Sequence, residues 1–366
     1  MRFARKARRG RALAIAGVVA SLVLAFALQP ILHNELRCMA PAATARPAAP
    51  SLIEPAQRRD EVNTYLTYPE WSIVHAYQDL ATVTRATREG DYDAFGAIAR
   101  YWSSLCSISQ YASRRGPIST DYKVMLYTIG LSFSLEMGLK GAYEKTLGAL
   151  TSALAGGTRT PEDAFALWVA EDYARFLRQV PWYEYPFGET LWRFWRETPL
   201  TGGNLVRKIE RRAALSLEWG AKALYAKVIA LGAAASPAPL RIRWVVTGLT
   251  DADLAADPRI TLVSRSDDRA VIETDRYATF TSILEGLAKR GHDIAEIAGN
   301  RHIMVTLLSP MPELPAGLDA KLLVAAPVAG RPVWHRLAID VKVKDLARLL
   351  RSLGPQGLVL DHVYDY

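Results

Sequence analysis

The sequence predicts an α+β protein with several domains: an N-terminal transmembrane helix, an all-α domain rich in aromatic residues, and a C-terminal α+β domain. The last is expected to contain a duplicated, ferredoxin-like strand–strand–helix–strand unit. Three observations lead to this prediction. An uncharged apolar segment covers residues 12–32, helical periodicity dominates residues 60–236, and strand-like alternation begins at residue 239. The chain has 366 residues, half of them hydrophobic, which is enough for about two folded domains with appendages.

The net charge of +8 is concentrated at the N-terminus. Six basic residues lie within residues 1–11, so the rest of the chain carries only +2. A body this close to neutral is not typical of nucleic-acid binders, and we expect no nucleic-acid partner. The sequence also lacks Cys/His zinc spacings, a Gly-rich phosphate loop and the GxSxG, HExxH and CxxC motifs. We therefore predict no metal and no cofactor.

Residues 12–32 are predicted to form a membrane anchor. They contain no charge, and about 20 apolar residues suffice to cross the hydrocarbon core as a helix. The basic segment 1–11 in front of them predicts a cytoplasmic N-terminus and an exported body, so the expected location is the bacterial inner membrane with a periplasmic body. The alternative is a cleaved signal peptide with Ala25-Phe26-Ala27 as its site. The apolar stretch continues through Ile31 and Leu32, which favours a retained anchor.

Residues 33–59 are rich in Ala and Pro and are expected to form a semi-extended linker between membrane and body. The two cysteines, Cys38 in this segment and Cys106 in an expected helix, are interpreted as free thiols. The alternative is a disulfide between them in an oxidising compartment.

The helical domain is expected over residues 60–236. Gly and Pro residues divide it into helices at about 91–112, 120–155, 161–179, 187–197 and 204–234, with another opened by Tyr68-Pro69. Val124–Leu139 and Leu215–Ala235 are apolar enough to suggest further membrane spans. Both are interpreted as core helices, because charged residues recur at helical spacing in or directly after each of them.

Aromatic residues are unusually dense in this domain and supply the candidate ligand site. We assign it to Glu70, Trp71, Trp182, Tyr183 and Tyr185. The alternatives are an aromatic-lined pocket, an interfacial belt at the lipid headgroups, and an ordinary packed aromatic core.

A carboxylate among apolar residues has a raised pKa and can act as a general acid. Glu70 and Glu184 are therefore the candidates if the protein is an enzyme acting on a lipid-like or aromatic substrate.

A basic cluster begins the last long helix of this domain. It consists of Arg207, Lys208, Arg211 and Arg212. Because cations are unfavourable near a helix N-terminus, something must offset them. One interpretation is ion pairing with carboxylates such as Glu197 or Glu210, and the other is contact with anionic lipid headgroups.

The C-terminal domain, residues 239–366, carries an internal repeat. A shift of 66 residues aligns Phe280 with Leu346, Leu284 with Leu350, and Gly291 with Gly357. These positions are the apolar stripe of a helix and its stop, as a duplicated unit requires.

The motifs TYPEW (67–71), PWYEYPF (181–187) and the terminal VYDY, together with the basic-flanked apolar segment, give the chain a resemblance to uncharacterised bacterial single-pass inner-membrane proteins. The resemblance implies a membrane location and no activity. We therefore expect a membrane-anchored periplasmic protein that binds an apolar or amphipathic ligand, or a partner protein, at the membrane face. The alternatives are the enzyme described above and a structural component of the cell envelope.

Overall fold

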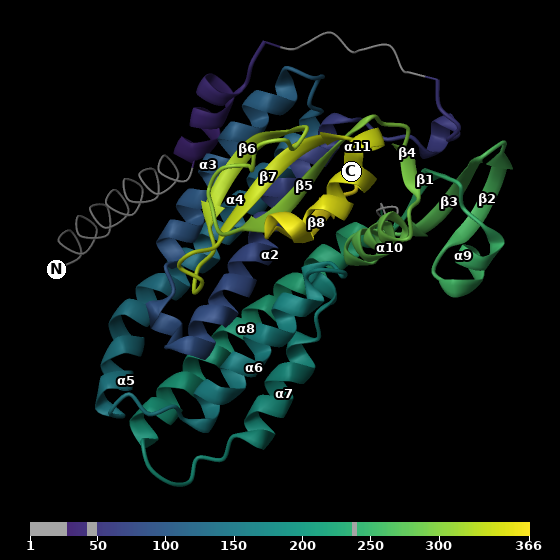
Figure 1. Cartoon of the computed structure of the whole chain (residues 1–366). Coiled ribbons are helices and arrows are strands. Elements are labelled where there is room, and N and C mark those ends of the chain that lie inside the picture. The colour runs from purple at the N-terminus through teal and green to yellow at the C-terminus, as the bar shows by residue number, and fades with distance from the viewer. Residues whose placement is uncertain (1–27, 42–49, 236–239) are drawn as a thin grey trace.

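The computed structural model describes residues 28–41, 50–235 and 240–366 (Figure 1). Within these ranges the protein is α+β, with ten α-helices, α2 to α11, and two four-stranded antiparallel sheets in the C-terminal region. Residues 1–27, which include the basic segment and most of the predicted anchor, lie outside the described residues. Among the helices that are described, none is long and apolar enough to cross a membrane.

The first part of the structure is a bundle of helices. After a short helix over residues 28–38, its members are α2 (Val62–Ala86), α3 (Ala94–Ser113), α4 (Thr120–Tyr143), α5 (Ala149–Leu154), α6 (Pro161–Phe176), α7 (Phe187–Glu197) and α8 (Leu205–Ala235). Capping residues explain where several of these helices begin. Ser119 caps α4 by accepting the backbone N–H of Tyr122, and Thr160 forms a capping box with Asp163 before α6.

Helix α2 begins earlier than the sequence predicts. The Tyr68-Pro69 pair was expected to open a helix, but α2 starts at Val62 and carries Pro69 in its interior. Pro in a helix removes one backbone hydrogen bond, at a substantial cost. Tertiary contacts offset this cost, because the turns before Pro69 are buried against a sheet: Thr64 donates to the Tyr364 carbonyl, and the Tyr65 hydroxyl donates to Asp340.

The second part contains the two sheets. Its elements are β1 (Arg241–Thr247), α9 (Asp251–Ala256), β2 (Thr261–Ser266), β3 (Arg269–Asp275), α10 (Ala278–Lys289), β4 (Asp293–Ile297), β5 (His302–Ser309), β6 (Ala320–Pro327), β7 (His335–Lys342), α11 (Val343–Ser352) and β8 (Val359–Tyr364). The strand orders are β2-β3-β1-β4 and β6-β7-β5-β8, so corresponding strands occupy corresponding places.

The two sheets also share their irregularities. In the first, β1 has a bulge at Val245/Val246 against β4, and in the second, β5 has one at Thr306/Leu307 against β8. The edge strands β2 and β6 each have a bulge against their neighbour as well. A shift of 66 residues carries β3 onto β7 and β4 onto β8. Each unit therefore has one more strand, at its start, than the expected strand–strand–helix–strand pattern.

The second sheet is covered on both faces. Helices α10 and α11 and the inner faces of both sheets share one core, which includes Trp244, Phe280 and Ile339. On its other face the second sheet contributes Met304, Ala338 and Tyr364 to the core of the helix bundle. The β2–β3 hairpin of the first sheet extends away from the bundle (Figure 1).

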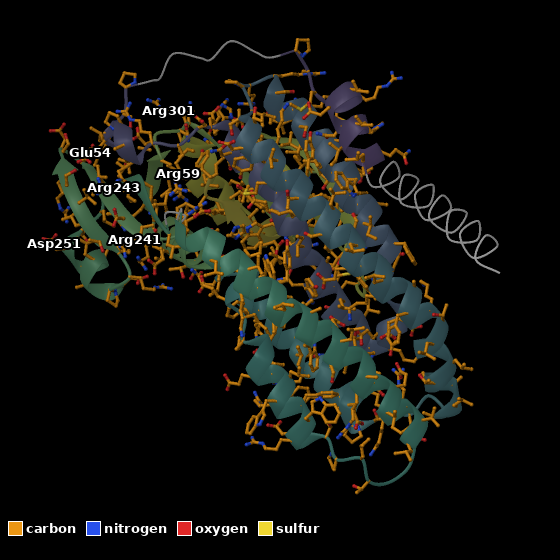
Figure 2. The ribbon with its side chains drawn as sticks, turned by 180° about the vertical axis from the view of Figure 1, so that it is seen from behind. Glu54, Arg59, Arg241, Arg243, Asp251 and Arg301 are labelled. Atoms are coloured by element: carbon orange, nitrogen blue, oxygen red, sulfur yellow. A yellow bond between two sulfur atoms is a disulfide. The ribbon has the colours of Figure 1, made fainter. Side chains whose placement is uncertain are left out.

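The expected linker makes specific contacts in its described parts. Ile53 is buried against Val245 and Val271 of the first sheet, and Glu54 forms an ion pair with Arg243 at 3.1 Å (Figure 2). Residues 33–38 are helical and pack on α3. Residues 42–49 lie outside the described residues.

The free-thiol interpretation of the cysteines is wrong, because Cys38 and Cys106 form a disulfide. The packing of helix 28–38 on α3 brings together two residues that are 68 positions apart, and sequence spacing does not reveal such a contact. The disulfide fixes helix 28–38, which contains the last residues of the predicted anchor, to the helix bundle.

Replacing both cysteines by Ala is expected to lower the free energy of unfolding by about 2–5 kcal/mol, because the unfolded chain loses a long closed loop. Urea unfolding of the full-length protein measures this effect. Wild-type protein unfolded in reductant is the matched comparison and should lose a similar amount. Equal stability of the oxidised wild type and the double variant would contradict the prediction.

Candidate functional site

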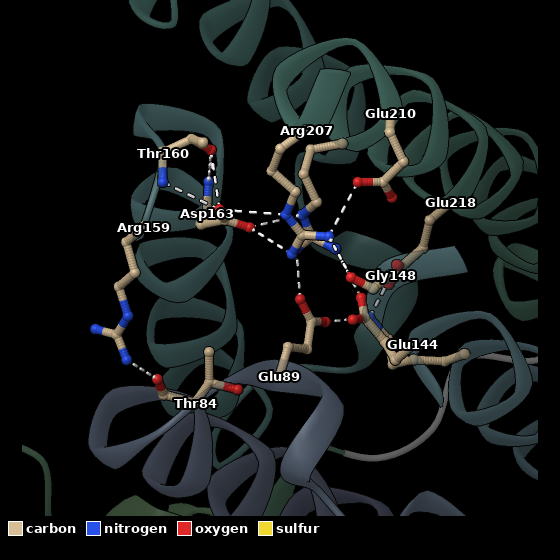
Figure 3. Close-up of polar contacts among 12 residues, drawn as sticks. Thr84, Glu89, Glu144, Gly148, Arg159, Thr160, Asp163, Arg207, Glu210 and Glu218 are labelled. Carbon is tan, nitrogen blue, oxygen red and sulfur yellow. Dashed lines mark hydrogen bonds and ion pairs between the residues drawn. The ribbon is translucent and has the colours of Figure 1, made fainter. Parts of the chain in front are cut away.

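The most concentrated set of charges in the bundle surrounds the inner side of α8 (Figure 3). Arg211 is 1% exposed, and its guanidinium contacts three carboxylates from three other segments. Its nitrogens lie 2.7 Å from Glu144 and 3.1 Å from Asp163, and they also bond Glu89. Helical spacing puts Arg207, Arg211 and Glu218 on this same inner side of α8, so a single helix supplies much of the network.

The predicted headgroup residues are all in the interior. Arg207 bonds Asp163 at 2.8 Å and Glu210 at 2.9 Å, and Arg212 bonds Glu162 at 3.3 Å. Lys208 donates to backbone carbonyls that precede α8. Contact with lipid headgroups requires exposed cations, whereas these four side chains are buried. The structure thus shows the ion-pairing interpretation, with Glu210 as one partner, while Glu197 pairs instead with Arg193 and Arg196.

A second part of the network joins α8 to α4. Lys222 lies 2.6 Å from Glu136, and the rings of Tyr77, Tyr173 and Phe187 surround its ammonium group at 5.0–5.5 Å. Lys140 bonds Glu89 at 2.6 Å and Glu218 at 3.0 Å. Except for Glu136, these side chains line a cavity of about 30 Å³. A cavity of this size holds about one water molecule and is too small for an apolar ligand.

The pKa values in the network follow from burial and pairing. Burial alone lowers the pKa of Lys140, but the carboxylates of Glu218 and Glu89 hold it above its ordinary value. Burial opposes the ionised form of Glu89, yet Lys140 and Arg211 keep its pKa below the usual range. Burial raises the pKa of Glu210 to about 7, and one of its oxygens has no hydrogen-bond partner among the described residues. Pairing with Lys140 and Arg211 therefore keeps Glu89 ionised inside the bundle, whereas Glu210 is only partly compensated.

Glu70 and Trp71 are adjacent in sequence but enter different environments. Glu70 accepts a hydrogen bond from the Tyr122 hydroxyl of α4 at 2.7 Å. The Trp71 ring stacks on His362 of β8, with ring centroids 3.5 Å apart. Burial is the main cause that raises the pKa of Glu70 to about 7.

The other three residues of the candidate site, Trp182, Tyr183 and Tyr185, belong to another part of the bundle. Tyr185 donates to Asp172 at 3.0 Å and packs on Tyr173, while Trp182 packs on Tyr225 and Tyr183. Within the described ranges, no hydrogen bond or ring contact joins this group to Glu70 or Trp71. The five predicted residues thus lie in two places. Glu184, the other candidate acid, is exposed.

Sequence reasoning missed a polar cluster between α2 and the second sheet. Asp361 of β8 lies 3.3 Å from the His75 ring nitrogen and 2.9 Å from Arg336, and all three side chains are buried. Burial lowers the pKa of His75 to about 4, so this His–Asp pair is a neutral imidazole beside a carboxylate. The signal available in the sequence was the pair of polar residues at consecutive positions of the terminal strand, Asp361-His362.

One group in the described part of the chain has the residue types of a metal site: His33, Cys38 and Cys106. The two sulfur atoms are bonded to each other, and a disulfide does not ligate metal as a thiolate does.

Glu70→Gln tests the protonation of this partly buried carboxyl, which Tyr122 hydrogen-bonds and on which the charges of Arg276 and Asp365 also act. Its folded pKa, about 7, is above its ordinary value of 4.5, so its stabilising contribution is complete below 4.5 and is lost as the pH rises through 7. Relative to the Gln variant, the wild type should lose up to about 3 kcal/mol over this range. Urea unfolding at a series of pH values measures the difference. A difference that does not change with pH would contradict a protonated Glu70.

Comparison with known proteins finds no matching family model, no matching curated protein and no matching solved structure.

Proposed function

We propose that this protein is held in the bacterial inner membrane by residues 12–32, with a cytoplasmic N-terminus and a periplasmic body, and that it binds an apolar or amphipathic partner at the membrane face. The Cys38–Cys106 disulfide supports an exported body, since disulfides persist in oxidising compartments. The basic residues of α8 pair with carboxylates inside the bundle, so they leave the outside of this helix apolar. An apolar outside suits an apolar partner.

One observation carries the proposal: the helix bundle exposes a broad apolar surface. We define the outer face of the bundle by Leu135 and Leu139 of α4, Leu154 of α5, and Leu217, Leu224 and Leu231 of α8, all of them 65–77% exposed. Ion pairs join α4 to α8, and a hydrogen bond from Thr151 to Glu210 joins α5 to α8, so the three helices are neighbours. Soluble monomers rarely expose contiguous apolar patches of this kind, and such patches mark binding surfaces.

Native mass spectrometry tests the proposal on full-length protein extracted gently from its own membranes. We expect a stoichiometric lipid-like adduct or a co-purifying protein. The variant Leu217→Glu with Leu224→Glu should lose it, whereas Leu262→Glu, an exposed apolar position on β2, should keep it. A bare monomer from wild-type membranes would overturn the proposal.

The properties of Glu70 support a second candidate function, which is acid/base chemistry on a lipid-like substrate. Its pKa of about 7, its hydrogen bond from Tyr122 and its partly buried position fit a general acid. Loss of a cellular phenotype in Glu70→Gln, with folding and any adduct intact, would favour this candidate. An unchanged phenotype would exclude it.

We also infer that the C-terminal region is a tandem duplication of a ferredoxin-like unit. The common strand order, the shared bulges and the 66-residue shift support this inference. The first unit has the short helix α9 between its first two strands, while residues 310–319 connect β5 to β6 without a helix.

A further inference from the structure

Helices α4 and α8 bury most of their charged residues at least partly while they expose several leucines, which is unusual for a water-exposed bundle. A helix on the surface of a soluble protein turns its apolar side inward and its charges outward. Among the charged residues of α4 and α8, only Asp121, in the first turn of α4, and Lys227 are exposed. The other charged residues are at least partly buried. The leucines of the outer face, in contrast, have no covering element among the described residues.

The apolar surface is long and wide. On α8 alone it extends from Val206 to Leu231, which at 1.5 Å per residue is about 38 Å. With α4 and α5 beside it, the surface spans three helices and is wider than the narrow seam at which one helix packs on another. A long apolar face with charged residues on the other side of the helices suits an orientation parallel to the membrane plane.

The predicted anchor is attached beside this surface. Leu28–Leu32, its last residues, belong to helix 28–38, which the disulfide to Cys106 fixes to α3. On the α4 side, Glu35 accepts from Tyr127 at 2.6 Å and from Lys123 at 3.1 Å. Almost no free chain therefore separates residue 32 from α4. If residues 12–32 lie in a bilayer, α4 lies next to that bilayer.

Residues typical of a lipid interface lie at one border of the outer face. Trp192 and Trp195 of α7, which packs on α8, are 60% and 51% exposed. Arg196 lies over the Trp192 ring at 4.4 Å. Tryptophan is enriched at the headgroup level of membranes, and arginine beside it pairs favourably with anionic headgroups.

We propose that the outer face of α4, α5 and α8 rests on the phospholipid bilayer that holds the anchor, with its leucines inserted at the acyl boundary. This inference rests on the proposed membrane location and names the bilayer as the apolar partner. The short, disulfide-fixed attachment of helix 28–38 favours the bilayer over a second copy of the chain or another protein.

Spin labelling of the full-length protein in vesicles of phosphatidylethanolamine and phosphatidylglycerol tests the inference. Both native cysteines are in the disulfide, so one added cysteine supplies the only thiol for the label. The test positions are Leu139→Cys, Leu217→Cys and Leu224→Cys. Val263→Cys on β2 is the matched control, since it is also an exposed apolar residue. Collisions with oxygen, which dissolves in lipid, are compared with collisions with a water-soluble nickel chelate.

At the three test positions, oxygen collisions should exceed nickel collisions several-fold, and at Val263 the order should reverse. Nickel-dominated spectra at all four positions would overturn the inference. Spin–spin broadening at Leu217 and Leu224 would overturn it in favour of a second copy. If the labels report water while native mass spectrometry still finds a partner, the lipid contact fails and the proposed binding function stands. If the anchor itself does not hold the protein in vesicles, the proposed location fails.

Discussion

Arg211→Met is expected to lower the free energy of unfolding by about 3–5 kcal/mol, the largest effect among the substitutions considered. Arg211 supplies the positive charge shared by Glu89, Glu144 and Asp163, and its side chain is almost fully buried. Met fills much of the same volume but leaves these carboxylates without their common partner. Burying an unpaired charge costs far more than an exposed ion pair contributes.

The matched control is Arg175→Met on α6. Arg175 forms an ion pair with Asp172 at 3.2 Å, but its side chain is 65% exposed. Loss of an exposed pair should cost less than about 1 kcal/mol. Urea unfolding of both variants at neutral pH measures the two effects. Similar small losses would show that the carboxylates around Arg211 take up protons or solvent at little cost.

Gly130→Ala is expected to destabilise the protein by about 1–3 kcal/mol or more, even though Ala is the better helix former. Gly130 lies in α4 where that helix crosses α3. A Cβ atom there would lie 2.5 Å from the Tyr101 ring and 2.9 Å from the Trp102 ring. Tyr101 is fully buried, and its hydroxyl donates to the Leu126 carbonyl, so the ring cannot move aside freely. The two helices would have to separate.

Gly220→Ala on α8 is expected to change the stability in the opposite direction. No atom outside the helix's own local backbone lies within 4 Å of the position that its Cβ would take. Replacing Gly by Ala at an unobstructed helix position should stabilise by up to about 1 kcal/mol. Thermal unfolding followed by circular dichroism compares the pair. Stabilisation by both substitutions would mean that α3 and α4 are not in close contact at Gly130.

Much of the fold was predictable because the relevant signals are local. The helical period of residues 60–236 and the strand alternation in the C-terminal region are properties of neighbouring residues, and they agree with the α+β architecture. The candidate site was less predictable. Glu70 and Trp71 are neighbours in sequence, yet a helix directs consecutive side chains about 100° apart, so one contacts α4 and the other β8.

Local patterns in the sequence were enough to predict the α+β class and the helical spacing of the charged residues in α4 and α8. Which side of α4 and of α8 is buried depends on long-range packing. The charged stripe of Glu136 and Lys140 recurs at four-residue spacing, and periodicity alone cannot tell a solvated stripe from one that meets charges on another helix. Sequence patterns likewise cannot reveal the pairing of Cys38 with Cys106, which are 68 positions apart. Burial and pairing depend on partners distant in sequence, and those partners turn the charges of α4 and α8 inward and leave their leucines outward.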